Sequence, residues 1–372
     1  MTGKFLSLFA LASFTVALCA ATLQMDSSRG EKVFKSESCI ACHAINGEGG
    51  HSAPDLGRLL DRNFTPATLA GTMWNHAPTM WAAIAKGGVQ RSSLDEQAAA
   101  DLFAYFYSAR FFERPGDAAR GKRLFHERTC DSCHGLTSSP DSAAPPVSQW
   151  KSLGDPIEIT QALWNHSSAM AAELQTRKLS WPQLSSQDLS DLLVYFRNQP
   201  GTPPKQPAFI TTAGSEGEAL FASKGCKKCH DPGTLLSRNG LDGKPLTDVA
   251  AAMWGHSTKM NVPPVHFEAN EMRELISYLW ANQFFAVNGN ADRGKKEFTA
   301  KRCASCHDDP AAKTPDLSAR QEPIYASTMV SVLWRHGPQM LDRMKQQGIR
   351  WPRFDSSQMS DVIAYLNSRR KP

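Results

Sequence analysis

The chain has 372 residues, a length that allows about two to four domains. Beyond a short apolar run near the N-terminus, no apolar stretch approaches the roughly 20 residues that a membrane-spanning helix needs, which excludes further spanning segments. The formal net charge of +5 and the sequence pI near 8.7 would on their own favour an acidic partner. The motifs described below predict bound groups that add negative charge, so the basic sequence does not support that inference.

The first predicted element is a secretory signal segment. Lys4 is followed by an apolar run over residues 5–18 and by the small residues Ala20 and Ala21, which is typical of a signal peptide cleaved near residue 21. An uncleaved anchor is the second alternative, because the run is too short to span. Lipidation at Cys19 is a third, disfavoured by the bulky Leu18 before it. We therefore expect a signal peptide at residues 1–21 and a soluble, exported protein that is periplasmic or otherwise extracytoplasmic.

The sequence that follows is built around one motif that occurs four times. Eight of the nine cysteines belong to Cys-x-x-Cys-His motifs, each with two cysteines followed at once by a histidine: Cys39, Cys42 and His43; Cys130, Cys133 and His134; Cys226, Cys229 and His230; Cys303, Cys306 and His307. This spacing is typical of c-type haem attachment. Two thiols three positions apart reach two vinyl groups on one edge of a porphyrin, and the next histidine reaches the iron from the proximal side. The motifs predict four covalently attached haem c groups and divide the chain into copies one to four.

Other chemistries for a Cys-x-x-Cys pair are weaker here. A zinc site would need cysteine pairs that converge, and a thioredoxin-like dithiol would need a βαβ context that the sequence lacks. Because each haem carries two propionates, the holoprotein is expected to be mildly acidic despite its basic sequence. We therefore predict no nucleic-acid partner and no binding to a membrane surface, with membrane contact only through a possible partner complex.

Each copy has the same helical frame around its motif. A Gly-x-x-x-Phe segment precedes the motif, and an apolar helix with a tyrosine closes the copy. Gly30, Phe34 and Tyr105 are the residues of copy one. Glycine and phenylalanine four apart share a helix face, so we expect the two helices to cross closely at the glycine. These segments are equally explained as ordinary amphipathic helices with a core stripe.

A proline follows each motif. Such a proline lacks an N–H and fixes its φ, and it can present a carbonyl to the second nitrogen of the haem histidine, which would set the histidine tautomer. An ordinary turn proline is an equally good explanation for any single copy. The four prolines are Pro54, Pro145, Pro245 and Pro315.

The linkers between copies differ in composition. Residues 111–117 and 284–290 are short and similar, whereas residues 199–207 are rich in proline and predicted to be stiff. This difference predicts two halves of two copies each.

A Trp-x-His-x-x-x-Met pattern follows each motif and offers two distal ligands. The methionines Met80, Met170, Met260 and Met340 are the favoured ligands of the haem irons, and the histidines His76, His166, His256 and His336 are the alternative. Pro78 and Pro338 predict that the helix ends near the histidine, with methionine on the following turn. The tryptophans Trp74, Trp164, Trp254 and Trp334 are expected to wall the haem pockets.

With the opening helix, haem motif, proline loop, distal methionine and closing helix in place, each quarter resembles a class I cytochrome c domain. The resemblance implies a mostly α fold with little or no β structure: four tandem haem-binding domains at residues 26–112, 113–200, 208–286 and 287–372. In that family the methionine commonly lies just before the closing helix. Here Trp181-Pro182 and Trp351-Pro352 occupy that place in copies two and four.

The function that the resemblance implies is electron transfer, and we expect a tetrahaem single-electron carrier or relay between redox partner proteins. The alternative is a haem enzyme, a peroxidase or oxyanion reductase with one open iron, for which copy three, with His256, Met260 and His266, is the candidate. A haem subunit of a membrane respiratory complex is a third possibility. The sequence predicts no oligomeric state.

Overall fold

A computed structural model describes residues 25–57, 65–89, 94–109, 116–141, 144–154, 156–200, 212–213, 215–232, 234–241, 244, 246–260, 265–285 and 288–370. The predicted signal peptide, most of the proline-rich linker and Pro245 lie outside these residues. The described chain is mostly helical, as predicted, and its strands form only two short antiparallel pairs, β1 with β4 and β2 with β3.

The first two copies share one order of elements, in which an opening helix, the haem motif, a long helix and a closing helix follow one another. Copy one consists of β1 (Met25–Asp26), α1 (Ser27–Ser36), the 3₁₀ helix η1 (Cys39–Ala41), β2 (Ala44–Ile45), β3 (Glu48–Gly49), α2 (Pro66–Gly87) and α3 (Glu96–Ala109). Copy two consists of α4 (Ala118–Glu127), η2 (Cys130–Ser132), η3 (Val147–Gln149), α5 (Pro156–Thr176) and α6 (Ser186–Arg197).

The last two copies repeat this order. Copy three consists of β4 (Thr212–Ala213), α7 (Ser215–Ser223), η4 (Cys226–Lys228), α8 (Leu235–Arg238), α9 (Leu246–His256) and α10 (Glu271–Phe285). Copy four consists of α11 (Ala291–Ala300), α12 (Ala304–His307), η5 (Pro310–Ala312), α13 (Ala326–Gln346) and α14 (Ser356–Ser368). Copy three differs in its shorter distal helix, which ends at His256.

The predicted crossing of the opening and closing helices is confirmed in every copy. A Cβ on Gly30, Gly121, Gly217 or Gly294 would lie 2.0, 2.2, 2.5 or 1.9 Å from a backbone oxygen of the closing helix, so only glycine fits. The phenylalanine of the opening helix then meets the tyrosine of the closing helix, with ring centres 5.7, 6.0, 6.0 and 5.4 Å apart in copies one to four. This shared packing holds the haem motif at a fixed place on each copy.

An arginine and a buried aspartate fasten the same crossing in three copies. Arg29 forms a bidentate ion pair with Asp101, at 2.8 Å for both contacts, and Arg120–Asp191 and Arg293–Asp361 repeat it. In copy three Glu216 stands in place of the arginine, and the glycine lies against the carbonyl of Glu274. Two carboxylates cannot form this pair, so the crossing of copy three does not carry the arginine–aspartate contact of the other copies.

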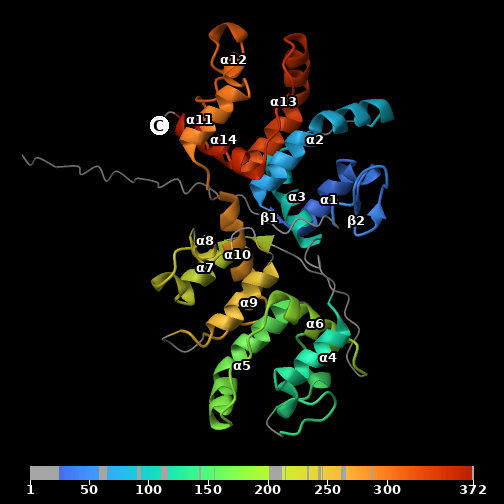
Figure 1. Cartoon of the computed structure of the whole chain (residues 1–372), viewed down its shortest axis with the longest axis vertical. Coiled ribbons are helices and arrows are strands. Elements are labelled where there is room, and N and C mark those ends of the chain that lie inside the picture. Colours follow the sequence, from blue (N-terminus) through green and yellow to red (C-terminus); the bar gives the residue numbers. More distant parts are fainter. Residues whose placement is uncertain are drawn as a thin grey trace, which may run out of the picture.

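The four copies are not arranged in chain order. Helix α2 of copy one packs on α13 and α14 of copy four, so the blue and red parts of the chain lie side by side (Figure 1). Copy one also contacts copy three, where β1 pairs with β4 and the Tyr107 hydroxyl donates to the Lys244 carbonyl at 2.6 Å. Copy three meets copy two through α9 on α5. The spatial order is therefore four, one, three, two.

This order corrects the expectation of two halves divided by the proline-rich linker. The pairs that pack together are copies one and four and copies two and three, because the distal helices of each pair, α2 with α13 and α5 with α9, pack on each other. One hydrophobic cluster runs through copies one, three and four and reaches Ile157 and Trp164 of copy two, while the remainder of copy two has a small core of its own.

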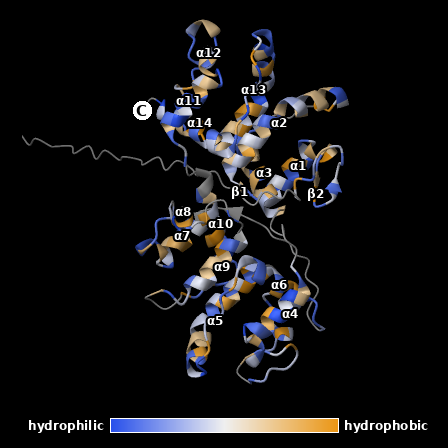
Figure 2. Ribbon diagram, viewed as in Figure 1, coloured by the Kyte–Doolittle hydropathy of each residue, from blue (hydrophilic) through white to orange (hydrophobic). Residues whose placement is uncertain are grey.

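The helices are amphipathic, and hydrophilic and hydrophobic residues share each of them (Figure 2). Among the described residues, none of the helices combines the length and the hydropathy that crossing a bilayer requires.

Candidate haem-binding sites

The two cysteines and the histidine of each motif are placed by one tight turn. The residue before the first cysteine adopts a left-handed backbone conformation in all four copies, with φ between 59° and 80°. The backbone N–H of the histidine then donates to the carbonyl of the first cysteine, at 3.0, 2.8, 2.9 and 2.9 Å in copies one to four. One turn therefore presents both thiols and the imidazole together, which is the arrangement that haem attachment requires. The residues in the left-handed conformation are Ser38, Thr129, Gly225 and Arg302.

The predicted proline carbonyl is present in copies one and two. Nδ1 of His43 lies 2.9 Å from the Pro54 carbonyl oxygen, and Nδ1 of His134 lies 3.0 Å from that of Pro145. A carbonyl only accepts, so Nδ1 carries the proton and the lone pair of Nε2 is free for a metal. Pro145 accepts from the Trp150 indole as well. In copy four, burial lowers the pKa of His307, and the nearby Pro315 carbonyl acts in the opposite direction. The distance and angle between Nδ1 of His307 and that carbonyl do not make a hydrogen bond.

The thiols are suited to neither a redox dithiol nor a zinc site. Burial raises the pKa of Cys39, Cys130 and Cys303 to about 11, whereas a reactive dithiol needs a lowered pKa. All eight motif cysteines are free, and within the described part of the chain no group of histidine, cysteine and carboxylate side chains could hold a metal ion by itself. These observations favour a porphyrin over the two alternatives.

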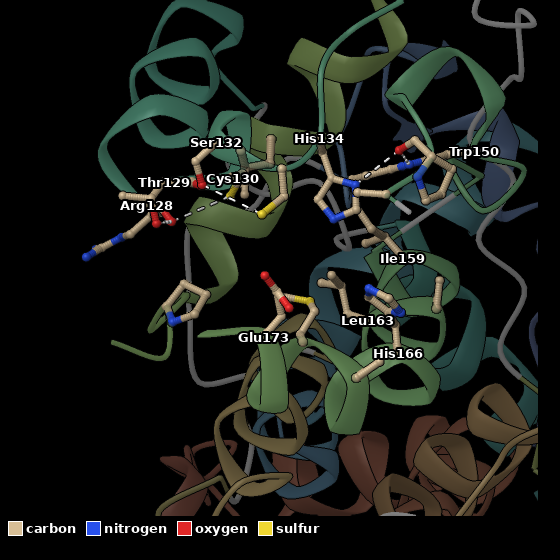
Figure 3. A pocket seen from close by; sticks show the side chains of 18 of the residues that line it. Arg128, Thr129, Cys130, Ser132, His134, Trp150, Ile159, Leu163, His166 and Glu173 are labelled. Carbon is tan, nitrogen blue, oxygen red and sulfur yellow. Dashed lines mark hydrogen bonds between the residues drawn. The ribbon is translucent and has the colours of Figure 1, made fainter. Parts of the chain in front are cut away.

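Copy two contains a cavity of about 600 Å³ beside its motif. Cys130 and His134 lie on one side of it, and His166 and Glu173 of α5 lie on the opposite side (Figure 3). Cys133 and Met170 also line the cavity. Much of the remaining lining is apolar, and a cavity of this volume and character suits a cofactor of haem size. The residues fit the group: the thiols would hold it covalently and His134 would bind its iron. A bound haem would supply reversible one-electron chemistry at the iron.

The distal helix does not end at its prolines, which corrects the prediction from Pro78 and Pro338. Both prolines lie inside continuous helices, α2 and α13. Pro78 leaves the carbonyl of Trp74 without its intrahelical donor, and the indole N–H of Trp351 in copy four donates to that carbonyl at 2.9 Å. The helix tolerates Pro78 because another copy satisfies the freed oxygen.

In two copies the histidine of the Trp-x-His-x-x-x-Met pattern (the distal histidine) lies close to the histidine of the Cys-x-x-Cys-His motif (the proximal histidine). The ring centres of His134 and His166 are 6.1 Å apart, and those of His230 and His256 are 5.7 Å apart. Partial burial, followed by the charge of the proximal histidine, lowers the pKa of His76, His166 and His256, which favours the neutral form that binds metals. His76, His166 and His336 are exposed, whereas His256 is half-buried.

The distal methionines are half-buried near the same helices. Met80, Met260 and Met340 pack against the hydrophobic cluster, whereas Met170 lines the cavity of copy two. In copies one, two and four the histidine and methionine occupy one continuous helix, while in copy three Met260 lies beyond the end of α9.

The tryptophans have a role that the sequence did not reveal. Trp164 is absent from the cavity wall of its own copy, and its indole donates to the carbonyl of Val265 in copy three at 2.8 Å. Trp254 of copy three instead lines the cavity of copy two and donates to the carbonyl of Pro182 at 2.9 Å. In copy two, a tryptophan of the cavity wall is therefore supplied across the contact between copies.

The same clamp joins copies one and four. The Trp74 indole donates to the Pro352 carbonyl at 2.9 Å, and the Asn75 amide pairs with both backbone groups of Phe354, at 2.7 and 2.8 Å. Asn165 and Phe267 repeat the amide pairing between copies two and three. The Trp-Pro segment, which stands where the class I family carries its methionine, is thus a docking segment between copies. The shared Trp-Asn-His of copies one and two was the sequence signal for it.

Comparison with known proteins agrees with this geometry. The cytochrome c family matches residues 27–109, 118–200 and 291–370, which correspond to copies one, two and four. Neither the curated proteins nor the solved structures contain a match. Because the matched residues make up more than half of the sequence, the chain belongs to the cytochrome c family.

Proposed function

We propose that the protein is a tetrahaem c-type cytochrome that relays single electrons between redox partner proteins outside the cytoplasm. The observation that carries the count of four is the structure of copy three, which the family comparison does not cover. Its opening and closing helices cross where Gly217 meets Tyr278. Its motif turn has a left-handed residue before the first cysteine, and the backbone N–H of His230 donates to the Cys226 carbonyl, as in the other copies. The domain boundaries would be those predicted from the sequence.

The arrangement of the copies supports a relay with a defined route. Each copy packs on its neighbour in the order four, one, three, two, so an electron would pass between copies one and three at the centre and enter or leave at copies two and four. Partner proteins would then meet the molecule at its two ends, which are the bottom and top of the view in Figure 1. The protein's own residues set the potentials, through ligands and burial.

The test is a haem count with a kinetic measurement on the exported holoprotein. A pyridine haemochrome assay is expected to give four haems per chain, and a periplasmic fraction is expected to contain the mature protein without residues 1–21. A small reducing agent should reduce all four haems rapidly, and no slow step of substrate binding should precede the reduction. Three haems, or a haem that rapidly binds carbon monoxide and turns over peroxide or an oxyanion, would contradict the relay and favour the enzyme.

A further inference from the structure

We propose that the haems of copies two and three are bound by two histidines each, His134 with His166 and His230 with His256, rather than by histidine and methionine. This inference rests on the proposed function, because it assumes that each motif carries haem. It departs from the histidine–methionine pair that the resemblance implies, and it assigns the distal role in these two copies to the alternative residues.

The first argument is the separation of the rings. A metal–imidazole bond is about 2 Å long, and the ring centre lies about 1 Å beyond the nitrogen, so two imidazoles that bind one metal from opposite sides have centres about 6 Å apart. The ring centres of the two pairs are 6.1 and 5.7 Å apart. In copy two both rings face the same cavity from opposite walls (Figure 3).

The second argument compares the two copies. In copy two, Met170 is part of a continuous helix, whereas in copy three the helix ends at His256 and Met260 follows three further residues of turn. The position of the methionine on the backbone therefore differs, yet the distance between the histidines is nearly the same. A ligand is expected to keep its geometry between repeats, and the two histidine pairs do so.

For copies one and four, Met80 and Met340 stay the predicted ligands.

The angle between the rings gives the proposal a spectroscopic signature. The imidazole planes cross at 70° in copy two and 66° in copy three. Ligand planes near perpendicular leave the iron d orbitals almost degenerate, which produces a strongly anisotropic low-spin ferric signal in electron paramagnetic resonance. We expect two such haems per chain, and the near-red band of a methionine-bound haem at no more than two.

Matched substitutions in the full-length holoprotein separate the two ligands. His166→Ala is expected to convert one haem of the four to a high-spin form that added imidazole returns to low spin, while Met170→Ala leaves the spin state of every haem unchanged. The opposite pattern, or near-red bands from all four haems of the unsubstituted protein, would overturn the proposal.

The pyridine haemochrome count keeps the two ideas apart. Four haems with methionine bands at every one would leave the relay in place and remove the bis-histidine assignment, whereas fewer than four haems would contradict the proposed function itself. The spectra of the unsubstituted protein decide the ligands even where His166→Ala fails to fold.

Discussion

At the scale of single residues, the buried aspartate of the helix crossing in copy four links the fold to pH. Asp361 is 4% exposed and accepts hydrogen bonds from Arg293 and from the backbone N–H of Asn290. Burial acts to raise the pKa of Asp361, but the hydrogen bonds and the charge of Arg293 outweigh it, and the pKa lies below its usual value. A carboxyl group with a lowered folded-state pKa stabilises the fold only while it is ionised.

We therefore expect acid to weaken copy four through Asp361. The stabilisation is fully present above the unfolded-state pKa of about 4 and is lost as pH falls from there through the lower folded-state pKa. Asp361→Asn should lower the free energy of unfolding at neutral pH by about 1–3 kcal/mol and flatten its decline in that acidic window. Denaturant titrations followed by circular dichroism at several pH values measure both effects.

Glu31→Gln is the matched control, because Glu31 forms an exposed ion pair with Lys35. Such pairs contribute about 0–1 kcal/mol. An Asp361→Asn protein whose stability fell with pH as steeply as that of the parent would show that another group causes the acid sensitivity.

At the scale of elements, the close crossing of helices is the feature that the sequence predicted best. A Cβ added at Gly121 would lie 2.2 Å from the Asp191 carbonyl oxygen, so a larger residue would force the two helices apart. We expect Gly121→Ala to destabilise copy two by about 1–3 kcal/mol through overpacking. Thermal unfolding is the measurement, and Gly87→Ala is the control, because its Cβ would meet only Val89 at 3.7 Å. Equal effects of the two substitutions would contradict the packing account.

Pro78 and Trp351 are a second feature at this scale, because a side chain of copy four supplies a hydrogen bond that Pro78 removes from a helix of copy one. Trp351→Phe removes the indole N–H that replaces the missing backbone N–H at the Trp74 carbonyl, and a buried acceptor left unpaired costs about 1–3 kcal/mol. With Pro78→Ala the helix supplies its own N–H, so Trp351→Phe should cost less in that background. A double-mutant cycle isolates this coupling from the stacking of Trp351 on Trp74, which both backgrounds lose. Additive effects would show that the hydrogen bond contributes nothing.

The sequence predicted the local parts of the fold and of the haem sites because their causes are local. The Cys-x-x-Cys-His spacing, the glycine crossing and the carbonyl of Pro145 all depend on residues close in the chain or repeated in register. The expected helix end at Pro78 was wrong because the compensating donor, Trp351, lies 277 positions from the Trp74 carbonyl to which it donates. The haem wall was expected from Trp164 and comes from Trp254 for the same reason.

At the scale of the whole molecule, the Trp-Pro segment of copy four docks on copy one and that of copy two docks on copy three, and the first of these pairs is remote in sequence. Asn75→Ala removes two hydrogen bonds to Phe354 and is expected to loosen copy one from copy four. Hydrogen exchange should then rise in both α2 and residues 351–355, while α5 and α9 of the other pair keep their protection. Asn165→Ala is the matched variant and should produce the reverse pattern. An increase confined to α2 would show that the contact does not join the copies.

The pairing of copies one and four also has a consequence for how the chain is made. Trp74 and its acceptor at Pro352 are separated by 278 positions, so the first quarter of a growing polypeptide exists long before the segment that covers it. During that interval the apolar face of α2 has no permanent neighbour, and contacts of such long sequence separation form slowly. The order of synthesis therefore matters for maturation. Copy one would receive its haem before the segment of copy four that covers α2 has been synthesised. A nascent chain interrupted before residue 351 would leave the apolar face of α2 exposed to aggregation or to a chaperone.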